Sequence, residues 1–141
     1  MKRFRGGGAG SVYHDGKPVS DLWTGTRNGQ GEPWQQDTLS VSFSTTKGVV
    51  STLLHQQAAL GRIDYDAPVC EYWPEFGAQG KEHISVRDLL THRAGMFRMD
   101  NLDLEFDQVT DWDTVCAALA AAPADKSVAP HSVYHALTYG R

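Results

Sequence analysis

Hydrophobic and polar positions along this chain predict a β-hairpin near its amino end. Residues 11–14 and 18–23 are rich in β-branched, aromatic and other strand-forming side chains, which indicates two short strands. Asp15-Gly16 stands between them, a dipeptide that adopts the positive φ angles of a tight hairpin turn. The next stretch, residues 27–37, is polar and contains glycines and a proline, so we expect a loop there.

Three later segments carry the spacing and end signals of helices. The longest, residues 44–60, has apolar side chains on more than one face, so we expect a central and buried helix. Residues 85–88 form a capping box and open a helix that reaches about His92. Residues 110–113 form a second capping box, and the alanine-rich helix that follows it ends before Pro123.

Length and composition indicate an ordinary globular protein. The chain has 141 residues, 40% of them hydrophobic and 21% charged, which is enough for one domain with a hydrophobic core. Its net charge of −4 gives no reason to expect a nucleic acid or an anionic membrane as partner. Residues 1–9 are basic and glycine-rich and lead into no apolar signal segment. We therefore expect a disordered leader at 1–9 and a domain at 10–141.

The absence of targeting signals and the use of cysteine favour the cytoplasm. No apolar run approaches the ~18 residues that a membrane-spanning helix needs. Cys70 and Cys116 each stand in an apolar context, and two cysteines do not make a disulfide framework. We expect both thiols to be reduced and buried.

Ser44 and Lys47 form a Ser-x-x-Lys pair at the predicted start of the longest helix. Residues three apart lie on one face of a helix, so the amine would stand one turn behind the hydroxyl. This layout suits a serine nucleophile with an adjacent lysine base, provided that burial lowers the pKa of the lysine. The spacing alone also occurs by chance in roughly one of every two chains this long. A helix start with an exposed lysine in its first turn is the alternative interpretation.

Histidine and acidic residues provide weaker candidates. His131 and His135 are four apart and would share one face of a helix, as metal ligands can. No carboxylate accompanies them in the manner of zinc hydrolases. The acidic residues between positions 103 and 113 suit a solvated surface and helix caps. We therefore predict neither a metal nor a cofactor.

Four ordered segments together resemble a known family. They are residues 41–48 around the Ser-x-x-Lys pair, 72–76, 84–96 and 134–140. In order and spacing they resemble the serine β-lactamase and penicillin-binding-protein-like superfamily, and class C β-lactamase-like esterases come closest. This resemblance implies an α+β fold of the β-lactamase/transpeptidase type, with a helical region and an N-terminal antiparallel hairpin.

The resemblance also implies roles for three residues. Ser44 would be the acylated nucleophile, with its own backbone N–H as one oxyanion donor, and Lys47 would take the serine proton. Tyr134 would relay protons to the leaving group and to the deacylating water. The implied reaction is acyl-enzyme hydrolysis of a small ester or amide, which needs no cofactor.

By comparison with the family, this sequence is short. Members are more than twice as long, and their third motif, a Lys- or His-x-Gly on a sheet strand, supplies a second oxyanion donor. Residues 10–141 would then be a partial domain that lacks most of the central sheet. We expect truncation to impair turnover, and a C-terminal half is a candidate partner. The alternative is a non-catalytic fragment or interaction module.

Overall fold

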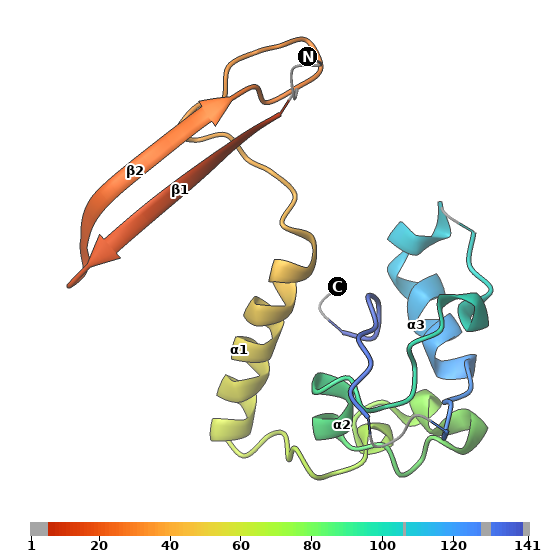
Figure 1. Cartoon of the computed structure of the whole chain (residues 1–141). Helices are drawn as coiled ribbons and strands as arrows, with labels where there is room; N and C mark the ends of the chain where they lie inside the picture. Colours follow the sequence, from red (N-terminus) through yellow and green to blue (C-terminus); the bar gives the residue numbers. More distant parts are fainter. Residues whose placement is uncertain (1–5, 106, 128–130, 140–141) are drawn as a thin grey trace. The chain divides into compact units, whose positions relative to one another are not determined.

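The computed structural model describes residues 6–105, 107–127 and 131–139 of the chain. The chain divides into two compact units, Met1–Val41 (unit 1) and Ser42–Arg141 (unit 2), and each is described by itself. Unit 1 carries the strands and unit 2 carries the helices (Figure 1). The predicted combination of a helical region with an N-terminal antiparallel hairpin is confirmed.

Unit 1 is built on a two-stranded antiparallel sheet. Strand β1, Gly7–His14, pairs with strand β2, Lys17–Gly25. Asp15 and Gly16 make the turn with φ angles of 47° and 72°. Both angles lie in the left-handed region, which explains why this dipeptide is found at the turn.

The start of β1 corrects the leader predicted for residues 1–9. Residues 7–9 belong to the strand and pair with β2. A Cβ atom added to Gly7 would lie 2.6 Å from the ring of Trp34, so glycine here permits close packing against an aromatic side chain. Residues 1–5 of the predicted leader lie outside the described residues.

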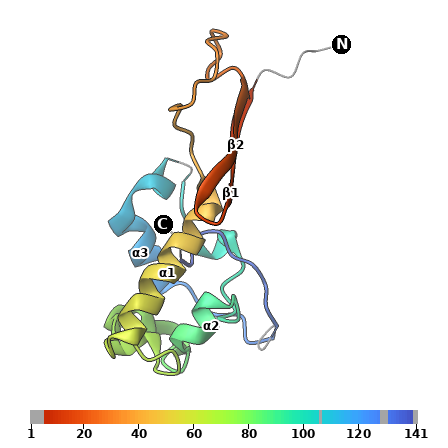
Figure 2. The same ribbon diagram turned by 90° about the vertical axis from the view of Figure 1, so that its left-hand side faces the viewer.

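Unit 2 consists of short helices connected by turns. Helix α1 spans Thr46–Ala59, α2 spans Val86–Leu90 and α3 spans Trp112–Ala121 (Figures 1 and 2). The 3₁₀ segments are η1 Phe43–Thr45, η2 Val69–Glu71, η3 Pro74–Gly80, η4 Met99–Leu102 and η5 Gln108–Thr110.

The predicted capping signals stand at the starts of α2 and α3. The Ser85 hydroxyl accepts the backbone N–H of Asp88, and the Asp88 carboxylate accepts the backbone N–H of Ser85, both at 3.1 Å. At α3 the cap is Asp111, the second residue of the predicted box, which accepts the N–H of Thr114 at 2.8 Å. Helix α2 ends before His92 because that residue takes a left-handed φ of 58°.

Half of the residues of α1 are exposed and only one is buried, so the prediction of a central and buried helix was wrong. Its one buried residue is Lys47, whereas Val49 and Leu53 are 61% and 53% exposed. The apolar side chains of α1 lie on several faces of the helix. The rest of unit 2 packs only against the face that carries Lys47. A hydrophobic helix is buried only on the faces that other elements cover.

The hydrophobic core of unit 2 is centred on Phe76 of η3, which is fully buried. Lys81 is also fully buried, and its Nζ donates to the carbonyl oxygens of Ala120, at 2.7 Å, and of Ala122. These carbonyls lie at the carboxyl end of α3, so the lysine satisfies acceptors that the helix leaves unpaired. Other buried core residues include Ile84, Val86, Met96, Leu102, Val115 and Leu119.

Within the described ranges, no helix has the length and apolar character needed to cross a membrane. The cytoplasmic location stays a prediction. Cys70 and Cys116 are free thiols, and both are partly buried rather than fully buried as expected.

Candidate active site

Ser44 lies in the 3₁₀ turn η1, two residues before α1 begins, and its side chain is exposed. The residue before it, Phe43, has a φ of 43°. A left-handed conformation is unfavourable for an aromatic residue and makes the chain turn sharply. The turn leaves the Ser44 hydroxyl at the amino end of α1, as the sequence predicted.

Lys47 lies in the first turn of α1 and is 7% exposed. Its Nζ donates to the carbonyl oxygen of Ala136 at 2.6 Å. The same atom is 5.5 Å from the ring centre of Tyr134 and 5.4 Å from that of Tyr139. The ammonium group therefore faces the segment 132–139 from α1, within the range of cation–π attraction to two rings.

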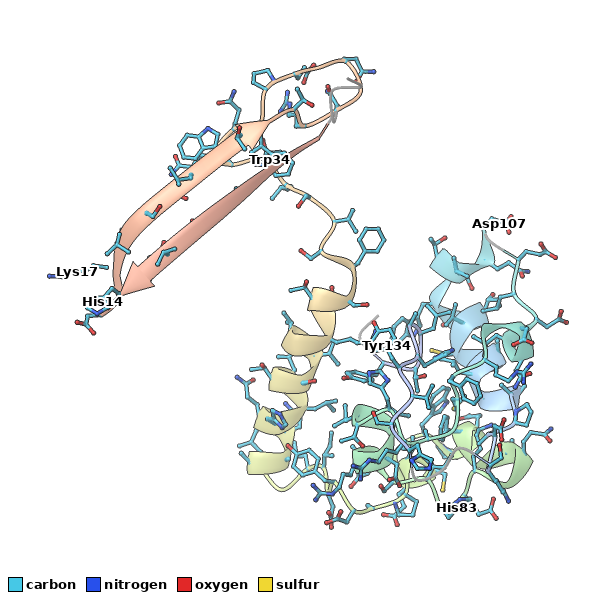
Figure 3. The ribbon with its side chains drawn as sticks, viewed as in Figure 1. His14, Lys17, Trp34, His83, Asp107 and Tyr134 are labelled. Carbon is cyan, nitrogen blue, oxygen red and sulfur yellow. The ribbon has the colours of Figure 1, made fainter. Side chains whose placement is uncertain are left out.

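Tyr134 completes the group. Its hydroxyl is 2.5 Å from the Ser44 hydroxyl, a short hydrogen bond between residues 90 positions apart in the chain. Figure 3 shows Tyr134 beside the upper part of α1. The hydrogen bond from Ser44 lowers the pKa of the Tyr134 phenol, and the positive charge of Lys47 lowers it further. The structure thus brings all three predicted residues together.

The segment 132–139 is attached to the end of α2 by three hydrogen bonds. The Ser132 hydroxyl donates to the Thr91 carbonyl oxygen at 2.8 Å. The backbone N–H of Val133 donates to the His92 carbonyl oxygen at 2.8 Å. The backbone N–H of His135 donates to Nδ1 of the His92 ring at 3.3 Å. These bonds fix the backbone on both sides of Tyr134.

His135 is buried behind this segment, with 3% of its surface exposed. Burial lowers the pKa of its imidazole to about 4, and the neighbouring His92 and Lys47 lower it as well. Its Nδ1 is hydrogen-bonded to the Thr138 hydroxyl. His131 is exposed and residues 132–139 form no helix, so the two histidines do not share a helix face. Among the described residues, no cluster of three or more metal-binding side chains occurs.

Acid should destabilise unit 2 through His135. The unfolded imidazole, with a pKa near 6.5, binds a proton that the folded side chain, with a pKa of about 4, does not. The contribution to stability is therefore complete above pH 6.5 and is lost as pH falls toward 4. Urea unfolding across this pH range should show that the free energy of unfolding falls less with acid in His135→Phe than in the wild type. His83→Phe, at an exposed histidine, should keep the full loss, and equal losses in all three proteins would contradict this assignment.

A cavity of about 480 Å³ opens beside the group. Tyr139 borders both this cavity and Lys47, and Val50 lines it from the next turn of α1. The lining is apolar and aromatic, which suits an apolar group better than a charged one. The other lining residues are Trp73, Trp112, Val115, Cys116, Leu119, Leu137 and Thr138.

Sequence reasoning missed two residues of the group. His92 has no role in the sequence analysis beyond the end of a predicted helix, although its ring centre is 4.7 Å from that of Tyr134 and 5.2 Å from that of Tyr139. Tyr139 contributes its ring to Lys47 and to the cavity. Their presence in two of the segments with family resemblance, 84–96 and 134–140, was the only available signal.

Comparisons with known proteins show which family the chain resembles. Residues 1–140 match the model of a family described as Beta-lactamase. The chain is 43% identical over 142 residues to the esterase/β-lactamase LipL of Mycobacterium tuberculosis, covering 99% of this chain and 32% of that protein. Over 70 residues it is 37% identical to the esterase EstB of Burkholderia gladioli, covering 47% of this chain and 18% of EstB.

Solved structures of similar proteins also match the chain. A penicillin-binding protein homolog from Caulobacter crescentus matches with a TM-score of 0.82 and 35% identity, over 94% of this chain and 36% of that one. A family VIII carboxylesterase matches with a TM-score of 0.67 and 42% identity, over 76% of this chain and 29% of that one. The chain therefore spans about a third of the length of these relatives.

Proposed function

We propose, because this chain belongs to the β-lactamase family, that it carries the nucleophile region of a serine hydrolase acting on a small ester or amide. Its relatives include esterases and β-lactamases. The observation that carries the proposal is the 2.5 Å hydrogen bond between the Ser44 and Tyr134 hydroxyls. A serine becomes a nucleophile when a base lies within hydrogen-bond reach.

In the proposed reaction, the Ser44 oxygen attacks the substrate carbonyl carbon while its proton moves to the Tyr134 oxygen. The lowered pKa of Tyr134 supports this transfer, because more of the phenol is then ionised near neutral pH. The Ser-x-x-Lys spacing assigns the serine proton to Lys47, and that role stays a prediction; in this proposal the Nζ atom, which donates to the carbonyl oxygen of Ala136, acts through Tyr134. The positive charge of Lys47 then favours the ionised form of Tyr134.

Collapse of the tetrahedral intermediate releases the leaving group, which takes the proton from Tyr134. A water molecule then attacks the acyl-Ser44 ester and gives its proton to the same tyrosine oxygen. Release of the acid returns the proton to Ser44. The cycle needs one group that alternates between base and acid, and it needs no cofactor.

The chain spans only part of the length of its relatives, and this favours a second candidate function. Because it spans 32% of LipL, it could be a non-catalytic fragment or interaction module that keeps the family's helices. In the hydrolase proposal, the part not spanned would supply a second oxyanion donor, either from a longer chain or from a separate C-terminal half. Loss of one such donor typically slows catalysis by ~10²–10³-fold.

The deciding experiment is covalent labelling of the chain with a fluorophosphonate, read by intact mass and peptide mapping. We expect a single adduct on the peptide that contains Ser44, because the phosphonate captures an activated serine without needing a complete substrate pocket. Ser42→Ala, which changes a neighbouring exposed serine, should be labelled normally. Ser44→Ala should not react. Equal and slow labelling of wild type and Ser44→Ala would support the non-catalytic module.

A further inference from the structure

We propose that His92 is a positioning residue for Tyr134, holding the tyrosine in place from the end of α2. The inference rests on the proposed role of Tyr134 at the nucleophile. His92 does not touch Ser44 in any contact described above, so its effect would pass through the tyrosine. Three separate contacts connect His92 to this segment.

The first two contacts fix the backbone around the tyrosine. Val133 donates its N–H to the His92 carbonyl oxygen at 2.8 Å, and His135 donates its N–H to Nδ1 of the His92 ring at 3.3 Å. Both chain neighbours of Tyr134 are therefore bonded to the same residue. Such paired bonds limit the movement of the residue between them, because each fixes one flanking peptide.

The third contact orients the tyrosine ring. The His92 ring is 4.7 Å from the ring of Tyr134, with an angle of 45° between their planes, and 5.2 Å from the ring of Tyr139. Lys47 Nζ faces these same two rings. The histidine and the lysine thus restrict the ring from which the hydroxyl reaches Ser44.

His92 is itself held firmly. Its backbone N–H donates to the Leu89 carbonyl oxygen at 3.2 Å, and the next residue, Arg93, donates to the Asp88 carbonyl oxygen at 2.7 Å. Its φ of 58° is uncommon for a residue other than glycine, although histidine, like asparagine and aspartate, adopts it more often than most. A left-handed residue directly after a helix turns the chain sharply, which here directs both the carbonyl and the ring toward segment 132–139.

The hydrogen bond from His135 requires Nδ1 of His92 to be without a proton. The titratable groups that face His92 are Lys47 from α1 and Tyr134, His135 and Tyr139 from segment 132–139. Burial lowers the pKa of the His92 imidazole, and the charge of Lys47 lowers it further. A lowered pKa favours the neutral ring, which is the form that can accept the bond.

Two substitutions of His92 distinguish a role in positioning Tyr134 from a role in the stability of unit 2. His92→Gly removes the ring and its acceptor, while glycine adopts a φ of 58° without strain. His92→Asn places a carbonyl oxygen close to the position of Nδ1 and also tolerates this φ. His83→Asn is the matched control, since Figure 3 shows His83 at the far end of unit 2 from Tyr134.

The readout is the pKa of Tyr134 in the full chain, measured by NMR with ¹³Cζ-labelled tyrosine and assigned with Tyr134→Phe. We expect a value below that of free tyrosine in the wild type and in His83→Asn. His92→Gly should move it up toward the ordinary value, because the hydroxyl loses its fixed place near Ser44 and Lys47. His92→Asn should recover most of the shift. Phosphonylation of Ser44 should slow about tenfold in His92→Gly and recover in His92→Asn.

The outcomes separate this inference from the proposed function. If wild-type Ser44 takes no phosphonate, the proposed function fails, while the Tyr134 titration still tests positioning. An unchanged Tyr134 pKa in His92→Gly overturns positioning, whatever happens to labelling. If His92→Gly does not fold, His92→Asn decides: a folded His92→Asn whose Tyr134 titrates like free tyrosine overturns the role of the acceptor.

Discussion

Replacing Lys47 with methionine is expected to slow phosphonylation of Ser44 by about 10³-fold, within the range that proton-transfer groups contribute. Methionine matches the length of the lysine stem, so the 7%-exposed site should remain filled. What is lost is the charge that faces the rings of Tyr134 and Tyr139. Without it, the pKa of Tyr134 should rise and a smaller share of the phenol can take the serine proton.

The measurement is the second-order rate constant for phosphonate labelling as a function of pH. In Lys47→Met the rate should rise with pH along a curve displaced to higher pH. Lys126→Met, which changes an exposed lysine, is the matched control and should behave as the wild type. A loss of less than about threefold in Lys47→Met would contradict a role in proton transfer, because such small factors also follow from surface charge changes.

Replacing Lys81 with alanine is expected to destabilise unit 2 by about 2–5 kcal/mol, the usual result of truncating a large buried side chain to alanine. The side chain is fully buried and donates to the carbonyl oxygens of Ala120 and Ala122. Its Nζ also lies 5.3 Å from the ring centre of Phe76. The substitution leaves two carbonyls at the end of α3 without this donor and opens a cavity beside the core aromatic.

Urea unfolding followed by circular dichroism would measure the loss, with Lys126→Ala as an exposed control that should change stability little. Burial lowers the pKa of Lys81 from 10.5, so in the alkaline range the unfolded chain binds more protons. Wild-type stability should therefore gain a contribution as pH rises toward 10.5, and Lys81→Ala should lack it. If Lys81→Ala lowered the free energy of unfolding by under about 1 kcal/mol, water would have to replace the lysine at both carbonyl oxygens, contrary to this prediction.

Elements with local signals were predicted well. The turn at Asp15-Gly16 and the capping box at Ser85 depend on residues within a few positions of one another, and the structure has both. The errors came from contacts beyond the local sequence. The predicted leader reached residue 9, whereas residues 7–9 pair with β2. The burial of α1 was predicted wrongly because apolar side chains do not reveal which neighbours will cover them.

In the candidate site, too, local features were predictable and contacts between distant residues were not. The spacing of Ser44 and Lys47 is local, since a helix start places a hydroxyl and an amine one turn apart whatever else the chain does. The meeting of Ser44 with Tyr134 spans 90 positions and was expected only from family resemblance. It depends on the bonds that attach segment 132–139 to the end of α2, and nothing in the spacing of residues indicates those bonds.

Short-range hydrogen bonding and hydrophobic periodicity thus determine the hairpin, the helix ends and the place of Ser44 at the start of α1. Contacts between distant segments determine that Lys47 is buried and that Lys81 donates to carbonyl oxygens at the end of α3. They also determine that the rings of His92 and Tyr134 lie against each other. The reason is physical: local structure follows from each residue's own backbone preferences, whereas burial and pKa depend on which remote side chains remove water from a group.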